Sequence, residues 1–261
     1  MLEDKAVFIT GGARGIGYGI ARAVLEAGAQ VAVGDLDEQA LSAARDTLIS
    51  ESSVTDDAVF AIVVDVVDEQ SVENALTTTQ SHFGYLDGLV NNAGIIQLGE
   101  DLRASAQDWR VQMEVNVIGT HNCCRTFANM LINAEQAGAI VNIASNCGKV
   151  GYPNMAGYNA SKAAVINLTR SLSSELSAHN INVNAICPGG VNTPMLMECA
   201  EAVGRRIGED PNELFKTMVP AQLGRHIEPL EIGRVTAFLL SDDANIIRGQ
   251  SINADGGDTP Y

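Results

Sequence analysis

The sequence has little positive charge and few histidines, and both shortages narrow the range of functions. Lysine and arginine number 16 against 32 acidic residues, so the formal net charge is −16. Nucleic-acid binding needs a concentrated basic patch, which the chain lacks, so we predict no nucleic-acid partner. The four histidines show no metal-ligand spacing, and we predict no metal site.

Cysteine and long apolar runs are also scarce. The odd number of cysteines, five, and the lack of Cys-x-x-Cys spacing argue against a disulfide framework or a zinc site. No run approaches the roughly 18 apolar residues that a membrane span needs. The acidic N-terminus leads directly into an apolar stretch, which is unlike a signal peptide. We therefore predict a cytoplasmic protein with no membrane partner.

The chain instead shows short β-branched runs that alternate with longer helical patterns. This alternation is typical of βαβ crossovers, and near-continuous apolar runs indicate strands that are buried on both faces. We predict one α/β domain over residues 1–261, a doubly wound parallel sheet of about seven strands with helices on both faces. The expected strands are 6–10, 30–35, 59–65, 88–91, 139–144, 182–187 and 250–253. The expected helices lie near 15–28, 38–49, 69–83, 106–134, 157–179 and 228–241.

One long irregular segment follows the sixth expected strand, at residues 188–227. Its stretches 194–197 and 205–207 are compatible with short helices. A long segment beyond the carboxyl end of a strand is well placed to cover a ligand, so we predict a substrate lid here.

A glycine-rich turn joins the first expected strand to the first helix, at residues 10–17. Glycines allow a tight turn and close approach to a pyrophosphate, while the helix N-terminus offers free amides. A glycine pattern between a strand and a helix is a strong indication of a dinucleotide site. The residues that we expect to bind the cofactor in this turn are Gly11, Arg14, Gly15, Ile16 and Gly17.

The second expected strand ends at Asp35, eighteen residues after Gly17. An acid at this place accepts hydrogen bonds from ribose hydroxyls and repels a 2′-phosphate, so Asp35 favours NAD over NADP. Leu36 stands where a basic residue would be expected for NADP. Arg14 is a contrary signal, because a cation in the glycine turn can reach a 2′-phosphate. We give Asp35 more weight and predict NAD.

Two further strand ends carry polar residues that are expected to face the same ligand. Asp65 ends the third expected strand and could bond an adenine amino group, with Val66 offering backbone contacts. The fourth strand ends in a segment that we expect to form the wall of the cofactor site, at the edge where open parallel sheets bind ligands. The residues of that segment that we assign to the cofactor are Asn92, Ala93 and Gly94.

Tyr158 and Lys162 are four residues apart in a helical pattern, and Ser145 lies thirteen residues upstream of the tyrosine. Positions i and i+4 of a helix share a face, so the phenol and the ammonium would point into the same space. A neighbouring cation favours the phenolate, which predicts a tyrosine pKa lowered toward working pH. Such a tyrosine can serve as general acid or base for an alcohol or a carbonyl.

Together these motifs, with Asn116 and the segment Pro188-Gly189…Thr193, resemble the short-chain dehydrogenase/reductase family along nearly the whole chain. The resemblance implies a Rossmann-type fold, a nicotinamide cofactor and a catalytic tetrad of Asn116, Ser145, Tyr158 and Lys162. Tyr158 would exchange a proton with the substrate oxygen, and Ser145 would hold that oxygen. Lys162 would bind the nicotinamide ribose, and Asn116 would hold a water of a proton relay. The resemblance assigns further cofactor contacts to Tyr158, Lys162, Pro188, Gly189, Val191 and Thr193.

The substrate end is expected to be formed by neutral polar and soft side chains. The segments 145–151 and 210–220 resemble those of sugar-alcohol dehydrogenases of this family, so we predict a polyol or related secondary alcohol as substrate. A phosphorylated substrate stays open, because Lys149, Arg205, Arg206 and Lys216 are in or near the lid. The residues assigned to the substrate are Gln97, Ser145, Cys147, Asn154, Tyr158 and Met195.

Two alternatives compete with an NAD-linked polyol dehydrogenase. One is an NADP-linked carbonyl reductase of the ketoacyl type, which Asp35 and the acidic surface argue against. The other is a non-catalytic NAD-sensing protein, which the intact tetrad argues against. The resemblance also implies a homo-oligomer, a tetramer, paired through the helices at 106–134 and 157–179 and the C-terminal strand.

Overall fold

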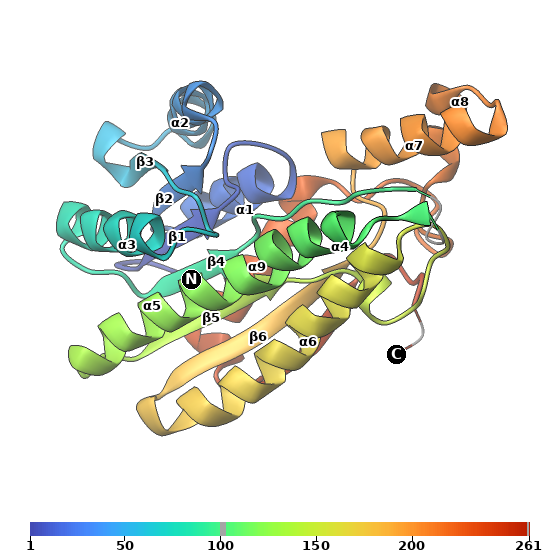
Figure 1. Cartoon of the computed structure of the whole chain (residues 1–261). Helices are drawn as coiled ribbons and strands as arrows, with labels where there is room; N and C mark the ends of the chain where they lie inside the picture. Colours follow the sequence, from blue (N-terminus) through green and yellow to red (C-terminus); the bar gives the residue numbers. More distant parts are fainter. Residues whose placement is uncertain (100–102, 260) are drawn as a thin grey trace.

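The computed structural model describes residues 1–99, 103–259 and 261 and shows a single α/β domain (Figure 1). Seven strands form one sheet in the order β3-β2-β1-β4-β5-β6-β7, and every pairing is parallel. The strands are β1 Ala6–Thr10, β2 Gln30–Asp35, β3 Val59–Val63, β4 Gly88–Asn91, β5 Gly138–Ile143, β6 Ile181–Pro188 and β7 Ser251–Ala254. The predicted fold class is confirmed.

The α-helices alternate with the strands along the chain, as the sequence pattern indicated. They are α1 Gly15–Glu26, α2 Glu38–Ser52, α3 Glu69–Phe83, α4 Ala106–Met113, α5 Thr120–Asn133, α6 Ala156–Leu176, α7 Pro194–Ile207, α8 Pro211–Thr217 and α9 Pro229–Leu240. Short helical turns are η1 Asp56–Ala58, η3 Glu114–Gly119, η4 Asn146–Gly148, η5 Ser177–His179 and η6 Asp242–Ala244.

Helices cover both faces of the sheet because successive side chains of each strand point to opposite faces. Val7 and Ile9 of β1 join a buried apolar core with α1, α2 and α9. Ala6 and Phe8 of the same strand join a second core with α3 and α5, on the other face. Figure 1 shows α3, α5 and α6 lying across one side of the sheet. The continuous apolar runs of the sequence therefore serve two cores at once.

The predicted helix 106–134 is wrong as one continuous element. It is interrupted after Met113 by η3, a π-helical turn, before α5 continues to Asn133. Within η3, a Cβ on Gly119 would lie 2.6 Å from Val66, so this turn brings the helix close to the turn that follows β3. A π-helical turn contains about one residue more than an α-helical turn, and the spacing of apolar residues in the sequence does not reveal this. Such turns occur often at functional sites.

The third strand is also shorter than predicted, since it ends at Val63 and not at Asp65. The Asp65 amide donates to the Ser71 hydroxyl at 3.0 Å, and its carboxylate accepts from the Val67 amide at 3.0 Å. These bonds turn the chain toward α3, so Asp65 belongs to the turn. The other predicted strands and helices agree with the structure to within three residues at each end.

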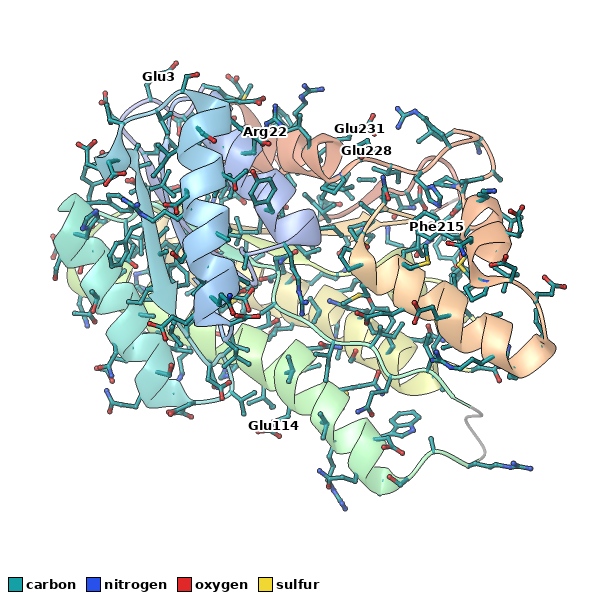
Figure 2. All side chains as sticks on the ribbon, turned by 90° about the horizontal axis from the view of Figure 1, so that it is seen from above. Glu3, Arg22, Glu114, Phe215, Glu228 and Glu231 are labelled. Carbon is teal, nitrogen blue, oxygen red and sulfur yellow. The ribbon has the colours of Figure 1, made fainter. Side chains whose placement is uncertain are left out.

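The segment 188–227 contains more regular structure than the sequence indicated. Residues 194–207 form one helix, α7, and α8 follows it, so 194–197 and 205–207 are the two ends of the same helix. Phe215 of α8 packs on the His226 ring with centroids 4.3 Å apart, and its carbonyl lies 2.9 Å from His226 Nε2. Seen from above, α7 and α8 stand beside the carboxyl edge of the sheet (Figure 2).

All five cysteines are free thiols, and three of them are buried. No helix of the described ranges is both long and apolar enough to cross a membrane. Within the same ranges, no group of three or more histidine, cysteine or acidic side chains is arranged to hold a metal ion.

Candidate active site

The site begins where β1 and β4 end side by side, the point at which the strand order reverses. The Thr10 hydroxyl accepts hydrogen bonds from the amides of Asn92 and Ala93, both at 3.0 Å. The side-chain amide of Asn92 donates in turn to the backbone carbonyls of Thr10 at 3.1 Å and Gly11 at 2.8 Å. These bonds join the two predicted cofactor segments into one wall, at the position where open parallel sheets bind ligands.

The glycine turn fits a dinucleotide pyrophosphate. Among the described residues no side chain caps the N-terminus of α1, and its first turn contains no acid, so its free amides suit an anion. Gly11 and Gly15 have φ of +63° and +56°, which side chains disfavour. A Cβ on Gly17 would lie 2.1 Å from the Gly11 carbonyl oxygen, so this position tolerates no side chain. Arg14 is exposed at the start of the helix, and Ile16 is half-buried beside it.

Asp35 lies at the end of β2, beside this turn. Its carboxylate accepts from the Leu36 amide at 2.8 Å and from the Ala13 amide at 3.4 Å, so backbone bonds hold it against the glycine turn. Leu36 is 66% exposed and adds no charge. Asp65 is half-buried and Val66 is buried at the neighbouring strand end. This end of the site therefore presents acids and backbone groups.

Asn116 lies in the π-helical turn η3 and is 1% exposed. Its side chain accepts from the Ile95 amide at 2.8 Å and donates to the Ile95 carbonyl at 2.9 Å. It also donates to the Ser161 hydroxyl at 3.0 Å, which ties it to α6. Its own carbonyl accepts from Thr120 at 2.8 Å. Asn116 thus connects three parts of the site.

Lys162 is buried on α6, with its ammonium donating to the Ile143 carbonyl at 2.9 Å. Burial lowers the pKa of this lysine from 10.5 to about 8, because a charged ammonium is poorly solvated there. A Cβ on Gly94 would lie 3.4 Å from the ammonium and 3.2 Å from the Asn116 amide oxygen. Gly94 therefore lets the cofactor wall approach both groups.

Tyr158 lies on the same face of α6, and the Lys162 ammonium is 5.7 Å from the centre of its ring. Burial raises the pKa of the Tyr158 phenol, and a hydrogen bond with Ser145 opposes that rise. The direction is opposite to the lowering that the spacing predicted, since desolvation of the buried phenolate is the largest cause. Ser145 is 7% exposed, and its hydroxyl accepts from the Cys147 amide at 3.1 Å.

The end of β6 and the turn after it form the opposite side of the site. Pro188 ends the strand, and a Cβ on Gly189 would lie 2.8 Å from the Asp255 carbonyl oxygen. Val191 is buried, and the Thr193 hydroxyl accepts from the Leu196 amide at 3.3 Å, which begins α7. A Cβ on Gly15 would lie 3.4 Å from the Thr193 side chain. The glycine turn and this turn are therefore neighbours.

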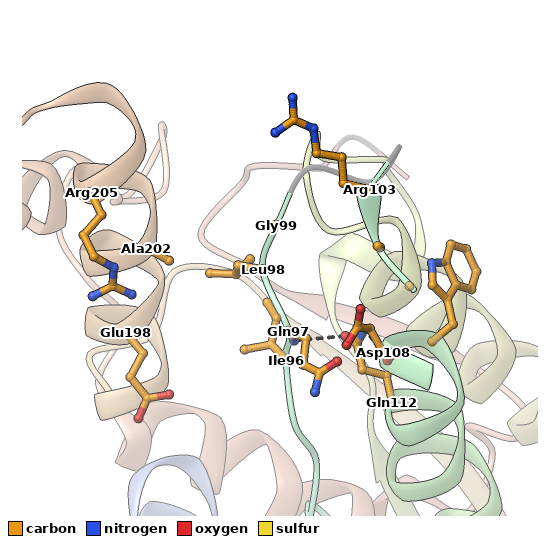
Figure 3. A pocket seen from close by; sticks show the side chains of 13 residues that line it. Ile96, Gln97, Leu98, Gly99, Arg103, Asp108, Gln112, Glu198, Ala202 and Arg205 are labelled. Atoms are coloured by element: carbon orange, nitrogen blue, oxygen red, sulfur yellow. Dashed lines mark hydrogen bonds between the residues drawn. The ribbon is translucent and has the colours of Figure 1, made fainter. Parts of the chain in front are cut away.

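A pocket of about 500 Å³ opens between α4, residues 96–99 and α7 (Figure 3). This volume is within the range of small-molecule sites, about 300–1,000 Å³. Its lining carries charges of both signs, Asp108 and Glu198 against Arg103 and Arg205. Gly157, which precedes Tyr158, also lines it, so the pocket adjoins the tetrad.

Of the predicted substrate residues, Gln97 lines this pocket. Cys147 is half-buried beside Met155, with the two sulfur atoms 3.9 Å apart. Asn154 has a φ of +64°, and its carbonyl accepts from the Gly99 amide at 3.2 Å. Met195 lies in the first turn of α7, half-buried.

Sequence reasoning did not identify several residues that line the pocket. Gln112 is the most informative of them, since it is a polar residue only 3% exposed. It precedes Asn116 by one helical turn, and this i, i+4 spacing was a usable signal in the sequence. The lining residues that were not predicted are Leu98, Gly99, Arg103, Ala104, Asp108, Trp109, Gln112, Gly157, Glu198 and Ala202.

Comparison with known proteins agrees with this geometry. A family model described as enoyl-(acyl carrier protein) reductase matches residues 11–259. The 3-oxoacyl-[acyl-carrier-protein] reductase of Thermotoga maritima is 34% identical over 256 residues, covering 98% of each chain. The 2-(S)-hydroxypropyl-CoM dehydrogenase 3 of Xanthobacter autotrophicus is 36% identical over 261 residues, with 99% of this chain and 98% of that protein covered.

A solved structure is similar over the same length. Levodione reductase superposes with a TM-score of 0.92 at 31% identity, with all of both chains covered. The match therefore includes the glycine turn, the tetrad positions and the segment with α7 and α8. On these grounds the chain belongs to the short-chain dehydrogenase/reductase family, a family of oxidoreductases that use a nicotinamide cofactor.

Proposed function

We propose that the protein is an NAD-dependent dehydrogenase that oxidises a secondary alcohol, a polyol or sugar alcohol, to the ketone or ketose. The observation that supports NAD is Asp35, which three backbone amides hold beside the glycine turn, together with the exposed, uncharged Leu36. A carboxylate there suits the two hydroxyls of an unphosphorylated ribose and repels a 2′-phosphate.

The tetrad residues supply proton transfer and orientation. A nicotinamide cofactor held by the glycine turn and the neighbouring strand ends would supply the acceptor for the hydride of the alcohol carbon. Tyr158 takes the hydroxyl proton as that hydride leaves, so the substrate C–H and O–H bonds break together with formation of the carbonyl. Ser145 donates a hydrogen bond to the same oxygen and stabilises the negative charge that develops on it.

Lys162 and Asn116 have supporting roles in the same proposal. With a pKa of about 8, the Lys162 ammonium can release a proton close to neutral pH, which suits the relay of a proton away from Tyr158. As a cation beside the phenol, it also favours the phenolate against the desolvation that burial imposes. Asn116 holds the segment at Ile95 and the α6 hydroxyl of Ser161 in place, and we assign the relay water to it.

The polyol assignment is supported by the polarity of the pocket. Its walls combine the side-chain amide of Gln97 with the charged groups of Asp108 on α4 and of Glu198 and Arg205 on α7. A hydroxylated substrate can exchange several hydrogen bonds with such groups, whereas a simple ketone offers them only its carbonyl oxygen. The substrate is therefore expected to carry hydroxyl groups along its length.

A second candidate is an NADP-linked carbonyl reductase. The Thermotoga maritima relative is named a 3-oxoacyl-[acyl-carrier-protein] reductase, and the exposed Arg14 at the start of α1 is a cation that could meet a 2′-phosphate. This reading differs from the first in the cofactor and in the preferred direction.

The test is the absorbance of reduced nicotinamide when the protein meets NAD, or separately NADP, and a panel of polyols, polyol phosphates, vicinal diols and simple secondary alcohols. Rapid NADH formation with a polyol supports the proposal. Turnover confined to NADPH and a ketone would refute it in favour of the reductase. A protein that binds NADH and turns over nothing would be the non-catalytic alternative.

We also propose that the protein acts as a homotetramer, with α5, α6 and β7 as the paired elements. An exposed apolar side chain within the predicted pairing helix 106–134 is consistent with a partner surface, namely Ile118 at 44% exposure in the turn before α5. Light scattering after gel filtration measures the mass directly, and a monomer of 27.5 kDa would refute this assembly.

A further inference from the structure

We propose that Gln112 is a positioning residue that holds the wall of the substrate pocket in place for catalysis. This inference rests on the proposed function, because it assigns how the same site binds its alcohol. Gln112 lies on α4, one turn before Asn116, and it is not one of the four tetrad residues.

The segment after the Asn-Asn-Ala-Gly turn is held by two side-chain amides at two points. Asn116 binds both backbone groups of Ile95, at 2.8 and 2.9 Å. Gln112 accepts from the Gln97 amide at 3.1 Å, the bond drawn as a dashed line in Figure 3. Because Ile95 and Gln97 are two residues apart in an extended segment, the two amides fix its direction as well as its position. That segment forms one wall of the pocket.

Gln112 is itself held in one orientation. Its Nε2 donates to the Asp108 carbonyl at 3.2 Å, which leaves Oε1 as the acceptor for Gln97. The side chain is 3% exposed, and a Cβ on Gly157 would lie 2.7 Å from Nε2. The carboxamide thus lies directly on the backbone of Gly157, the residue before Tyr158. Gln112 therefore relates the pocket wall to the start of the helix that carries the tyrosine.

The effect should fall on the substrate and not on the cofactor. Gln97 and Gly157 line the pocket, whereas the glycine turn and Asp35 belong to strands on the other side of the sheet's switch point. Loss of the Gln112 acceptor frees the Gln97 amide and lets the wall move. The reacting groups on α6 keep their own bonds, so the change is expected in KM for the alcohol.

The test uses Gln112→Met, which keeps the length of the side chain but removes both hydrogen bonds. Amide hydrogen exchange of the peptide containing Gln97 should become about 2- to 10-fold faster, the range for one lost hydrogen bond. The KM for the alcohol should rise by a similar factor, with kcat and the Kd for NADH little changed. Gln107→Met, on the exposed side of the same helix, is the matched control and should change none of these.

Two further variants separate positioning from simple loss of stability. Gln112→Glu keeps an acceptor for the Gln97 amide but, when ionised, loses the donor to the Asp108 carbonyl, so it should restore part of the exchange protection and of KM. Gly157→Ala leaves Gln112 in the chain but places a methyl where its Nε2 lies, so it should raise KM although alanine favours a helix more than glycine does. This variant also serves if Gln112→Met fails to fold.

Unchanged exchange at Gln97 in Gln112→Met would overturn the proposal, and so would faster exchange with an unaltered KM. The exchange measurement needs no turnover, so it tests the bond between Gln112 and the Gln97 amide independently of the reaction. A wild-type protein that oxidises no alcohol refutes the proposed function alone, and KM is then measured for the ketone that it reduces.

Discussion

Replacement of Lys162 by methionine should make the protein more stable while it abolishes turnover. The pKa of Lys162 falls from 10.5 to about 8 because the ammonium is fully buried. At about 1.4 kcal/mol per pKa unit, keeping this charge in the fold at pH 7 costs about 3 kcal/mol. The variant loses the hydrogen bond to Ile143, worth about 1 kcal/mol. The net gain is therefore about 2 kcal/mol, or about 5 °C in Tm.

The sign of the pH dependence follows from proton linkage. Between pH 8 and 10.5 the unfolded chain holds a proton on Lys162 that the folded chain has released. The wild type therefore gains stability relative to the variant as pH rises through this interval. By pH 9.5 about 2 kcal/mol of the variant's advantage should have disappeared. Burial also raises the pKa of the Cys124 thiol, but that thiol is present in both proteins and its effect cancels in the comparison.

The assay is urea unfolding of both proteins at one concentration, at pH 7 and pH 9.5, without cofactor. Lys216→Met replaces an exposed lysine that pairs with Glu213, and it should show no comparable gain or pH dependence. A Lys162→Met protein that is less stable than wild type at pH 7 would refute the reasoning. A stability difference that does not change with pH would refute the buried ammonium as its cause.

Three more variants test separate parts of the site. Tyr158→Phe should abolish turnover with the Kd for NADH nearly unchanged, measured by steady-state kinetics and fluorescence titration; substantial residual activity would contradict its role in proton transfer. Asp35→Ala should narrow the preference for NAD over NADP, measured as the ratio of the two kcat/KM values, by about 1–3 kcal/mol, the scale of one charged contact. If this ratio did not change, residues other than Asp35 would set the preference. Gly17→Ala should lower the free energy of unfolding by about 1–3 kcal/mol and weaken NADH binding, because its Cβ would lie 2.1 Å from the Gly11 oxygen. Gly151→Ala, which meets nothing within 4 Å, is its control.

The fold could be predicted from the sequence because its signals are local and repeated. Runs such as Val7-Phe8-Ile9 indicate strands buried on both faces, and the structure places their side chains in two cores. The break in the helix 106–134 was not predictable, because it results from tertiary contacts. Asn116 binds Ile95, and Gly119 packs on Val66, both of which are remote in the sequence.

The meeting of the strand-end segments that we assign to the cofactor was also predictable, because parallel strands end at one edge of a sheet. The structure joins two of these segments through Thr10 and Asn92. The pocket lining was predicted less well. Gln97 was assigned to the substrate, but the buried Gln112 was not. The i, i+4 spacing to Asn116 could have placed Gln112 on the same helical face, whereas its bond to the Gln97 amide depends on the fold.

The sequence by itself determined the order of the elements, the glycine turn, the acid at Asp35 and the placing of Tyr158 and Lys162 on one helical face. These depend on residue types at short spacing. The tertiary structure decided the electrostatic state of the site. Spacing predicted a lowered tyrosine pKa, yet burial raises it and lowers the pKa of Lys162. Desolvation depends on how many atoms from distant segments surround a group, and only the packed fold sets that number.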